Sequence, residues 1–387
     1  MDRKKKRDQK ANLEKDLLLD PESMARRKKK KRRKTVSIIL IGAVLIVCIV
    51  FISFQAVRAI GRSNLKSMAA DHVPELTQTA DETDLTEQEK ENWQEGWVRY
   101  KNQIYAYNQD IMTFLFMGID KRDDVAEEEE GTNGGQADAL FLLVVNPHDK
   151  TIRVIGINRN TMTDIDLYNE DGAYMTTTTA QIAVQHGFGN GLEESCEYQV
   201  EAVRKLFYNL PVHGYCAINM EAIISLTDLM GGIELTALED VRSKLPGEDR
   251  NTNIVTKGET ALLDGRKAYS YVSYRDVNTA GSADSRLQRQ QQFLGEFIKK
   301  VKTSAAADIS LPVRMYNSIT KQMVTNVTAD EVAYLASTVT GYHFDKSQFY
   351  TLQGENVQGE QFEEFYVDED ALYKMILDIF YEPVENQ

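Results

Sequence analysis

The chain has 387 residues and a formal net charge of −14. From residue 58 onward the imbalance is larger, with 29 basic against 53 acidic residues, which argues against a generic polyanion-binding surface and against nucleic acid as a partner. The cysteines Cys48, Cys196 and Cys216 are too few for a disulfide-framed fold, and the five scattered histidines give no support to zinc chemistry. A single bridge between Cys196 and Cys216 stays open at this point.

The N-terminal region predicts a membrane anchor. Residues 1–34 carry 16 Lys and Arg against 6 Asp and Glu, and residues 35–57 contain no charged residue. The second stretch is long enough to cross a bilayer as a helix, and the basic residues before it place the N-terminus in the cytoplasm. A cleaved signal peptide is disfavoured because the apolar run exceeds its usual length. We therefore expect a single-pass membrane protein that contacts membrane lipid and has an extracellular C-terminal domain.

Residues 58–85 are polar and acidic, which is typical of a stalk, and residues 86–387 form the predicted domain. Thr86 and Glu89 have the spacing of a capping box. Trp93, Trp97, Tyr100 and Ile104 then recur at helical spacing. This pattern predicts a helix over residues 86–108.

Three apolar runs, residues 111–118, 139–145 and 151–157, predict buried strands. Asp120 follows the first run, Asp138 precedes the second and Arg159 follows the third. Residues 146–150 have hairpin chemistry, and an antiparallel hairpin brings Asp138 and Arg159 to the same rim of the sheet. Asp120 joins them if the first strand runs parallel to the third.

The remaining chain alternates between helical and strand-like patterns, which favours one α/β/α sandwich domain around a mixed central sheet. The predicted helices are 196–209, 220–230, 258–265, 266–271, 285–303, 329–341 and 368–381, and the predicted strands are 233–236 and 348–352.

Cationic and amide side chains are concentrated between residues 270 and 292. Arg275 follows a short apolar run, and Arg286, Arg289 and Gln290 lie at helical spacing near a predicted helix start. Guanidinium groups and a helix N-terminus both favour a phosphate or pyrophosphate. Arginines on a helix often lie only on its solvent-exposed face and bind no ligand. This cluster is more informative, because it is cationic within a domain that is acidic overall.

Asp120 and Asp138 suit a divalent cation beside such a phosphate site. Mg²⁺ takes one or two carboxylates together with phosphate oxygens, and Mn²⁺ accepts the same ligands. The plainer alternative is that Asp138 caps a turn and Asp120 pairs with Lys121 or Arg122.

Several segments, in this order, resemble the LytR-CpsA-Psr family of membrane-anchored cell-wall phosphotransferases over roughly residues 110–300. The matching segments are Leu115–Asp120 (LFMGID), Gln136–Leu140 (QADAL), Ile157–Thr161 (INRNT), Leu263–Gly265 (LDG) with Ala268, Tyr271–Asp276 (YVSYRD) and Arg286–Gln291 (RLQRQQ). Each motif is weak alone, whereas their shared order is specific.

The resemblance implies a transferase of cell wall biogenesis. It would move an anionic glycopolymer, such as teichoic acid or capsule, from a polyprenyl-pyrophosphate carrier to peptidoglycan. By position, Asp120 and Asp138 would hold Mg²⁺, and Arg159, Arg275, Arg286 and Gln290 would bind the pyrophosphate with Arg289 in support. Arg275, Asp276 and Arg286 are the catalytic candidates, with Asp276 either a general base or a partner of Arg275. Helices near residues 203–207, 223–229 and 293–298 are candidates for a lipid slot or for ordinary core.

Three departures from the family pattern motivate alternatives. Ser273 replaces an arginine, Asn158 and Asn160 replace a proline and an aspartate, and Ala283 replaces an acid, leaving Asp284 one position away as a candidate N-cap. The main alternative is a non-catalytic envelope protein that binds the lipid pyrophosphate or regulates its use. A simple pyrophosphatase is the third reading.

Overall fold

The structure is a computed structural model that describes residues 60, 63–64, 73–76, 93–126, 134–169, 171–245, 247–249, 251–276, 279 and 281–384. The chain divides into two compact units, Met1–Arg58 and Ala59–Gln387, and every described residue belongs to the second. The predicted cytoplasmic tail and membrane span therefore lie outside the described residues. Within the described part of the chain, no helix combines the length and the apolar character that crossing a membrane requires.

A six-stranded mixed sheet forms the centre of the second unit, with strand order β13-β8-β3-β4-β5-β14. The β3–β4, β4–β5 and β8–β13 pairs are antiparallel, whereas β3–β8 and β5–β14 are parallel. These strands are β3 (Met112–Ile119), β4 (Ala137–Asn146), β5 (Thr151–Ile157), β8 (Gly214–Ile218), β13 (Met323–Thr325) and β14 (Phe349–Thr351). The three strands predicted from apolar runs are thus confirmed, and β3 and β5 run in the same direction.

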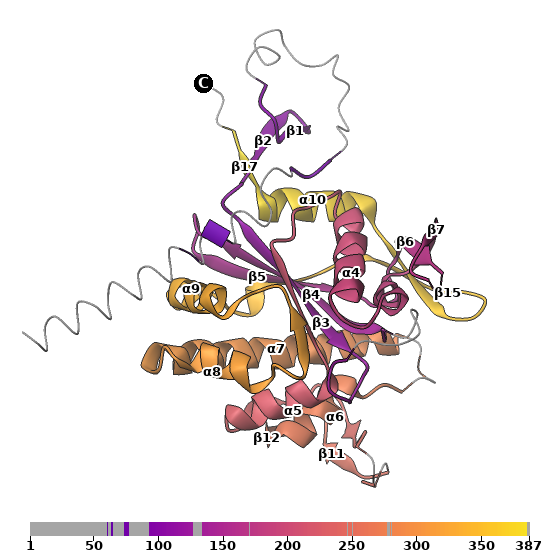
Figure 1. Ribbon diagram of the computed structural model, residues 1–387, viewed down its shortest axis with the longest axis vertical. Helices are drawn as coiled ribbons and strands as arrows, with labels where there is room; N and C mark the ends of the chain where they lie inside the picture. Colours follow the sequence, from indigo (N-terminus) through magenta and orange to yellow (C-terminus); the bar gives the residue numbers. More distant parts are fainter. Residues whose placement is uncertain are drawn as a thin grey trace, which may run out of the picture. The chain divides into compact units, whose positions relative to one another are not determined.

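Helices cover both faces of the central sheet, as Figure 1 shows. On one face α4 and α10 pack with the 3₁₀ helix η2 against Leu115, Leu142 and Ile155 in the main core. On the other face α7 and α9 pack against Phe114, Phe141 and their neighbours. The helices on the two faces include α4 (Glu193–Leu206), α5 (Met220–Leu229), α7 (Ser282–Ala307), α8 (Leu311–Ser318), α9 (Ala329–Val339), α10 (Glu369–Phe380) and η2 (Ile182–Phe188). The predicted three-layer α/β/α architecture is confirmed.

The predicted helix over residues 86–108 is wrong in its described part. Residues 97–107 form a hairpin of β1 (Trp97–Tyr100) and β2 (Gln103–Tyr107), which β17 (Tyr381–Pro383) extends. Lys101 and Asn102 have φ angles of 50° and 39°, the positive values of a two-residue hairpin turn. Aromatic and β-branched residues favour strands. The helical spacing of Trp97, Tyr100 and Ile104 is therefore a coincidence.

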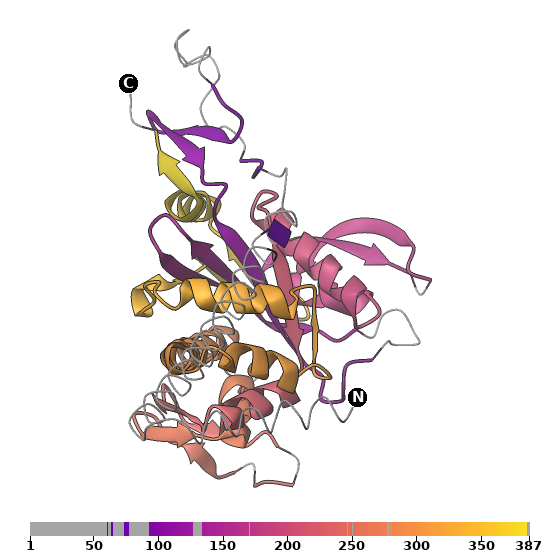
Figure 2. The same cartoon turned by 60° about the vertical axis from the view of Figure 1, so that its left-hand side comes forward.

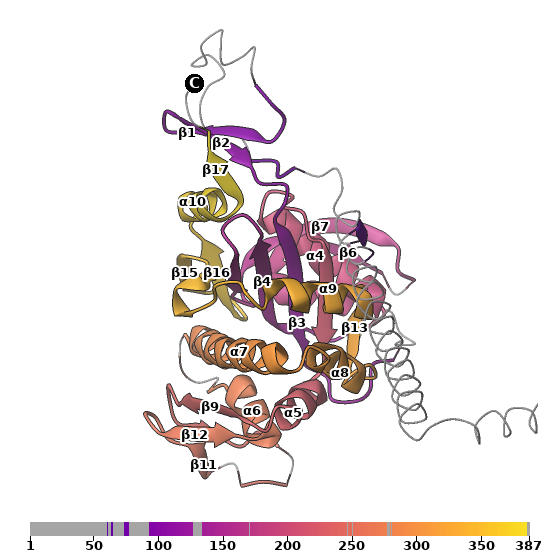
Figure 3. The same ribbon diagram turned by 90° about the vertical axis from the view of Figure 1, so that its left-hand side faces the viewer.

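A second region lies beyond α7 and α8 from the sheet, as Figure 3 shows, and contains α6 (Gly265–Ser273) with β9 (Ile233–Thr236) and β12 (Thr260–Leu263). α5 packs against both α6 and the sheet and so joins the two regions. The helix predicted over residues 258–265 is wrong. Leu263 is buried and Leu262 is exposed, which is the alternation of a strand, and Leu263 pairs with Ile233 of β9. The next predicted helix is confirmed as α6, whose N-cap Asp264 accepts from the Lys267 backbone N–H.

Gly265 has a packing role at the start of α6. A Cβ at this position would lie 2.5 Å from the carbonyl oxygen of Ile224 on α5. Glycine therefore lets α5 and α6 approach closely, and this contact positions the α6 C-terminus that leads into Arg275.

The remaining elements complete the same unit. Val73 to Leu76, in the predicted stalk, lie against it, and Leu76 is buried in the main core. Figure 2 shows the β6–β7 hairpin extending beside α4. The other short strands are β6 (Met162–Tyr168), β7 (Tyr174–Gln181), β10 (Val241–Arg242), β11 (Asn253–Val255), β15 (Gly354–Gln358) and β16 (Glu363–Val367).

Cys196 and Cys216 are both free thiols. Cys196 lies on α4 in the main core, whereas Cys216 belongs to the cluster formed with α5 and α8 on the other face of the sheet. The bridge left open by the sequence does not form, because the sheet separates the two sulfur atoms.

Candidate active site

Asp138, Arg159 and Arg286 meet at the rim of the sheet where β3 and β5 end. One carboxylate oxygen of Asp138 lies 2.6 Å from Nη1 of Arg159, and the other accepts from Nη1 of Arg286 at 2.8 Å. Arg159 also donates to Gln136. The predicted convergence of Asp138 and Arg159 is confirmed, and α7 brings Arg286 to the same carboxylate.

A cavity of about 490 Å³ opens beside this cluster. The described residues at its polar end include six charged side chains, two of them acidic and four cationic: Asp120, Asp138, Arg122, Lys244, Arg275 and Arg286. Arg159 does not line the cavity and holds Asp138 from behind. The excess of positive charge favours an anion here, within a chain whose net charge is −14.

Two buried guanidinium N–H groups at the rim have no hydrogen-bond partner among the described residues, namely Nη2 of Arg286 and Nε of Arg159. Burial lowers the pKa of Arg159, the neighbouring arginines lower it further, and Asp138 and Asp120 raise it. A buried donor without an acceptor costs free energy, so an incoming anion that supplied the acceptor would be stabilised.

Arg275 is half-buried where the α6 C-terminus leads toward α7. Its Nε donates to Oγ of Ser282 at 3.0 Å, and its Nη2 lies 3.8 Å from Glu363. Glu363 also accepts from the backbone N–H of Gly281. These contacts hold the Arg275 side chain at the edge of the cavity.

Gln290 and Arg289 occupy different positions although they are adjacent. Gln290 lines the cavity and donates to the carbonyl oxygen of Val272 at 3.2 Å. Arg289 is almost fully buried away from the cavity, where it pairs with Glu239 and donates to the carbonyl oxygens of Tyr271 and Tyr274. Arg289 therefore ties the α6 C-terminus to α7 and supports the cavity from behind.

The two acids on either side of the loop before α7 do not line this cavity. Asp276 is exposed on the far side of Arg275 and accepts from Oγ1 of Thr279 at 3.1 Å. Asp284 is not the helix N-cap, because that position is Gly281 in the left-handed conformation. Its carboxylate accepts from Asn158 at 2.6 Å, so two departures from the family pattern bond to each other.

Most of the other described residues that line the cavity are apolar. Residues of α5 and α7 line it with Phe116 of β3, among them Ile223, Leu226, Phe293 and Phe297. Two of the three predicted apolar segments thus reach the cavity, whereas Val203 and its neighbours belong to the main core. A polar end joined to an apolar channel suits an amphipathic ligand.

Sequence reasoning missed Glu363, Gln136, Lys244 and the role of Arg122. Arg122 donates to the hydroxyl of Tyr269 at 2.6 Å and lies 5.3 Å from its ring centroid, so this cation is fixed at the cavity wall. Glu363 and Lys244 belong to segments with no local motif, and nothing in their neighbourhood in the sequence signals the site.

Among the described residues, Asp120 and Asp138 are the two carboxylates that line the cavity. The described residues contain no group of three His, Cys, Asp or Glu side chains arranged for a metal ion. Two carboxylates beside an anion site are nonetheless the donor set that Mg²⁺ uses when substrate phosphate supplies its other ligands. Asp120 and Asp138 are the residues that would hold such an ion, and both oxygens of Asp138 also contact arginines.

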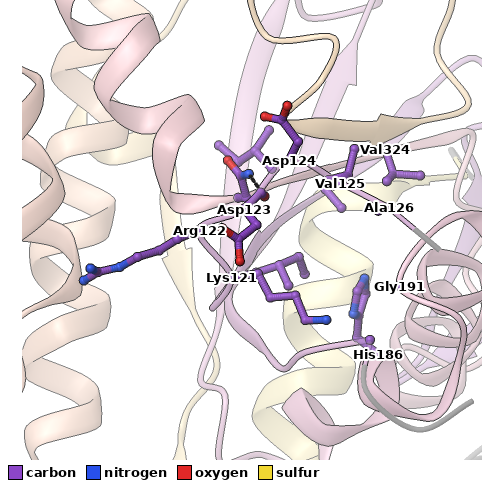
Figure 4. A pocket seen from close by; sticks show the side chains of 14 residues that line it. Lys121, Arg122, Asp123, Asp124, Val125, Ala126, His186, Gly191 and Val324 are labelled. Carbon is purple, nitrogen blue, oxygen red and sulfur yellow. Dashed lines mark hydrogen bonds between the residues drawn. The ribbon is translucent and has the colours of Figure 1, made fainter. Parts of the chain in front are cut away.

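A smaller pocket of about 220 Å³ lies past the end of β3, where Lys121 points toward His186 and Arg122 points away (Figure 4). Burial lowers the pKa of His186 to about 4, so its ring is neutral at neutral pH. Its Nδ1 lies 3.0 Å from the carbonyl oxygen of Gly135. Asp120 and Lys121 line different pockets, and the end of β3 therefore separates the two.

The fold and the site define a member of the LytR_cpsA_psr family, to which this chain belongs, since the family model matches residues 72–378. The chain is 26% identical over 192 residues to the polyisoprenyl-teichoic acid–peptidoglycan teichoic acid transferase TagU of Halalkalibacterium halodurans, covering 50% of this chain and 54% of the relative. It is 22% identical over 273 residues to TagV of Bacillus subtilis, a transferase of the same description, covering 70% of this chain and 64% of the relative. The chain thus spans between half and two thirds of these relatives.

Solved structures show the same fold. The crystal structure of B. subtilis TagV superposes with a TM-score of 0.54 at 22% identity, covering 70% of this chain and 95% of that chain. TagT bound to LI-WTA superposes with a TM-score of 0.51 at 19% identity, covering 70% of this chain and 89% of that chain.

Proposed function

We propose that this protein is a membrane-anchored transferase that moves an anionic glycopolymer from a polyprenyl-pyrophosphate carrier to peptidoglycan outside the cell. The observation that carries the proposal is Nη2 of Arg286, which has no hydrogen-bond partner among the described residues and lies at the polar end of a cavity that is otherwise mostly apolar. A lipid-linked pyrophosphate combines the two chemistries that this cavity offers. The relatives named as teichoic acid transferases support the same reaction class.

The donor's pyrophosphate lies at the polar end in this proposal, and its polyprenyl chain lies along the apolar wall. Arg275, Arg286 and Gln290 bind the phosphate oxygens, while Arg159 orients Asp138. When bound by Asp120 and Asp138, Mg²⁺ or Mn²⁺ supplies neutralising charge to the pyrophosphate. Phosphoryl transfer depends mainly on such positioning and charge neutralisation.

The chemical step is a substitution at the sugar-linked phosphorus. The oxygen of an acceptor hydroxyl forms a bond to this phosphorus, and the bond from the phosphorus to the bridging oxygen breaks. The bonding electron pair leaves with that oxygen as polyprenyl monophosphate. The hydroxyl proton passes to the Asp276 carboxylate, which follows Arg275 in sequence and lines a second depression together with it.

A transfer assay tests the proposal. Full-length protein in detergent is incubated with a lipid-linked glycopolymer, Mg²⁺ and a peptidoglycan oligomer, and the phosphodiester product and released polyprenyl phosphate are measured. Arg275→Ala is expected to lower product formation by roughly 100-fold or more. Wild-type protein that forms no product, or Arg275→Ala protein that forms as much as wild type, would overturn it. Free phosphate released without transfer would indicate a pyrophosphatase instead.

A second candidate is a non-catalytic binding or regulatory protein, and Ser273 is the observation that favours it. Ser273 lines the cavity, but its hydroxyl donates to the carbonyl oxygen of Tyr269 at 2.7 Å and brings no cation to the ligand. Donor binding without any turnover in the same assay would support this candidate.

A further inference from the structure

A second depression, of about 330 Å³, lies on the other side of Arg275 from the cavity. Among the described residues, Arg275 is the one side chain that lines both. Its contacts with Ser282 and Glu363 hold the guanidinium between the two spaces. A group bound in either space would therefore meet the same guanidinium.

The depression differs from the cavity in its chemistry. Among the described residues, hydroxyl groups of Thr279, Ser282 and Ser285 line it together with the phenol ring of Tyr274, and no aliphatic side chain of Val, Leu, Ile or Met does so. These residues offer hydrogen-bonding groups and one aromatic ring rather than a surface for a lipid chain.

The charges of the depression balance, unlike those of the cavity. Its described residues include three carboxylates and three cationic side chains, and Glu239 and Arg289 already pair with each other. The carboxylates of Asp240 and Asp276 would repel a polyanion. An uncharged ligand rich in hydroxyl groups fits this lining, because carboxylates and hydroxyls accept its hydrogen bonds.

We infer that this depression binds the acceptor, an uncharged hydroxyl-bearing sugar of a peptidoglycan glycan strand. The inference rests on the proposed function and deepens it by assigning donor and acceptor to opposite sides of Arg275. In this arrangement the acceptor hydroxyl approaches the phosphorus from the side on which Asp276 stands to take its proton. Arg275 binds the phosphate oxygens between the two substrates.

Ser285→Leu tests the assignment, with Gln288→Leu as the matched control. Both residues are exposed on α7 one turn apart, but only Ser285 lines the depression. Leucine suits a helix, and at position 285 it fills the depression without altering a charge. For full-length protein, we expect Ser285→Leu to raise KM for a peptidoglycan oligomer by roughly tenfold or more, with donor affinity unchanged within about twofold. Gln288→Leu should match wild type in both measurements.

Binding of a neutral N-acetylglucosamine oligomer, measured by saturation-transfer NMR, separates this inference from the proposed function. If wild type transfers nothing yet binds the oligomer and Ser285→Leu does not, the transferase proposal fails and the glycan site stands. An unchanged acceptor KM and unchanged oligomer binding in Ser285→Leu would overturn the inference while leaving the transferase intact. A loss of donor affinity in Ser285→Leu would also overturn it, since the depression would then hold the donor.

Discussion

Arg286 donates a hydrogen bond to Asp138 over 2.8 Å although 148 positions of sequence separate the two residues. The carboxylate is held on its other oxygen by Arg159. An acid and two arginines from three segments are therefore preassembled at one rim, and this arrangement suits the pyrophosphate site proposed above.

Arg286→Ala should reduce donor affinity and transfer by roughly 100-fold, because it removes the buried guanidinium that faces the cavity. Donor affinity is measured by titration calorimetry on full-length protein, and thermal unfolding checks that the variant is folded. Arg314→Ala is the control, since Arg314 pairs with Asp308 at an exposed site. Wild-type donor affinity in folded Arg286→Ala protein would show that this arginine does not bind the pyrophosphate.

Removal of divalent cation should abolish transfer and weaken donor binding, and Mg²⁺ or Mn²⁺ should restore both. Asp120→Asn should remove the Mg²⁺-dependent part of the donor affinity while leaving the metal-free part unchanged, because Asp120 lines the cavity and, among the described residues, forms no ion pair with an arginine. Calorimetry with and without Mg²⁺ measures the two parts. Transfer that persists in a chelator would rule out the assigned role of Asp120 and Asp138.

Ser273→Arg should increase donor affinity or transfer, because it adds a cation to the wall of the cavity at a position that now supplies none. The transfer assay and the calorimetric titration report on it. If wild type and Ser273→Arg both bind the donor and neither turns it over, the protein is a binding protein.

Arg289→Leu should lower the free energy of unfolding by about 2–4 kcal/mol, since it leaves the carbonyl groups of Tyr271 and Tyr274 without their buried donor. Urea denaturation measures the change. Arg289→Lys should recover only part of the loss, because an ammonium group cannot reproduce the three separate contacts. Full stability of Arg289→Leu would contradict the structural role assigned to this residue.

The attachment of β17 to β2 should weaken as pH rises. Hydrogen bonds to Asp110 and Glu382 raise the pKa of His148 above its ordinary 6.5. The folded state therefore favours the protonated ring. Its contribution to the free energy of unfolding is complete below pH 6.5 and is lost as pH rises through the raised pKa. The advantage in thermal stability of wild type over His148→Gln should shrink across this window, and added salt should reduce it because the pair is exposed. A pH-independent difference would contradict this.

The local sequence pattern was sufficient to predict the part of the site that the β4–β5 hairpin forms. The apolar runs of β4 and β5 place Asp138 and Arg159 together, and helical spacing places Arg286 and Gln290 on one helix. The helix predicted near residue 100 was wrong because the hairpin turn there has no glycine. Lys101 and Asn102 adopt its positive φ angles, so the sequence does not reveal the turn. Glu363 was missed because β16 is brought to the site only by tertiary packing.

The most direct test is a structure of the protein with a polyprenyl pyrophosphate and Mn²⁺, located by its anomalous scattering. We predict a manganese peak between Asp120 and Asp138, with phosphate oxygens within hydrogen-bond distance of Nη2 of Arg286 and the prenyl chain beside Phe293 and Phe297. Pyrophosphate density away from Arg286, or a manganese peak that touches neither carboxylate, would contradict the account.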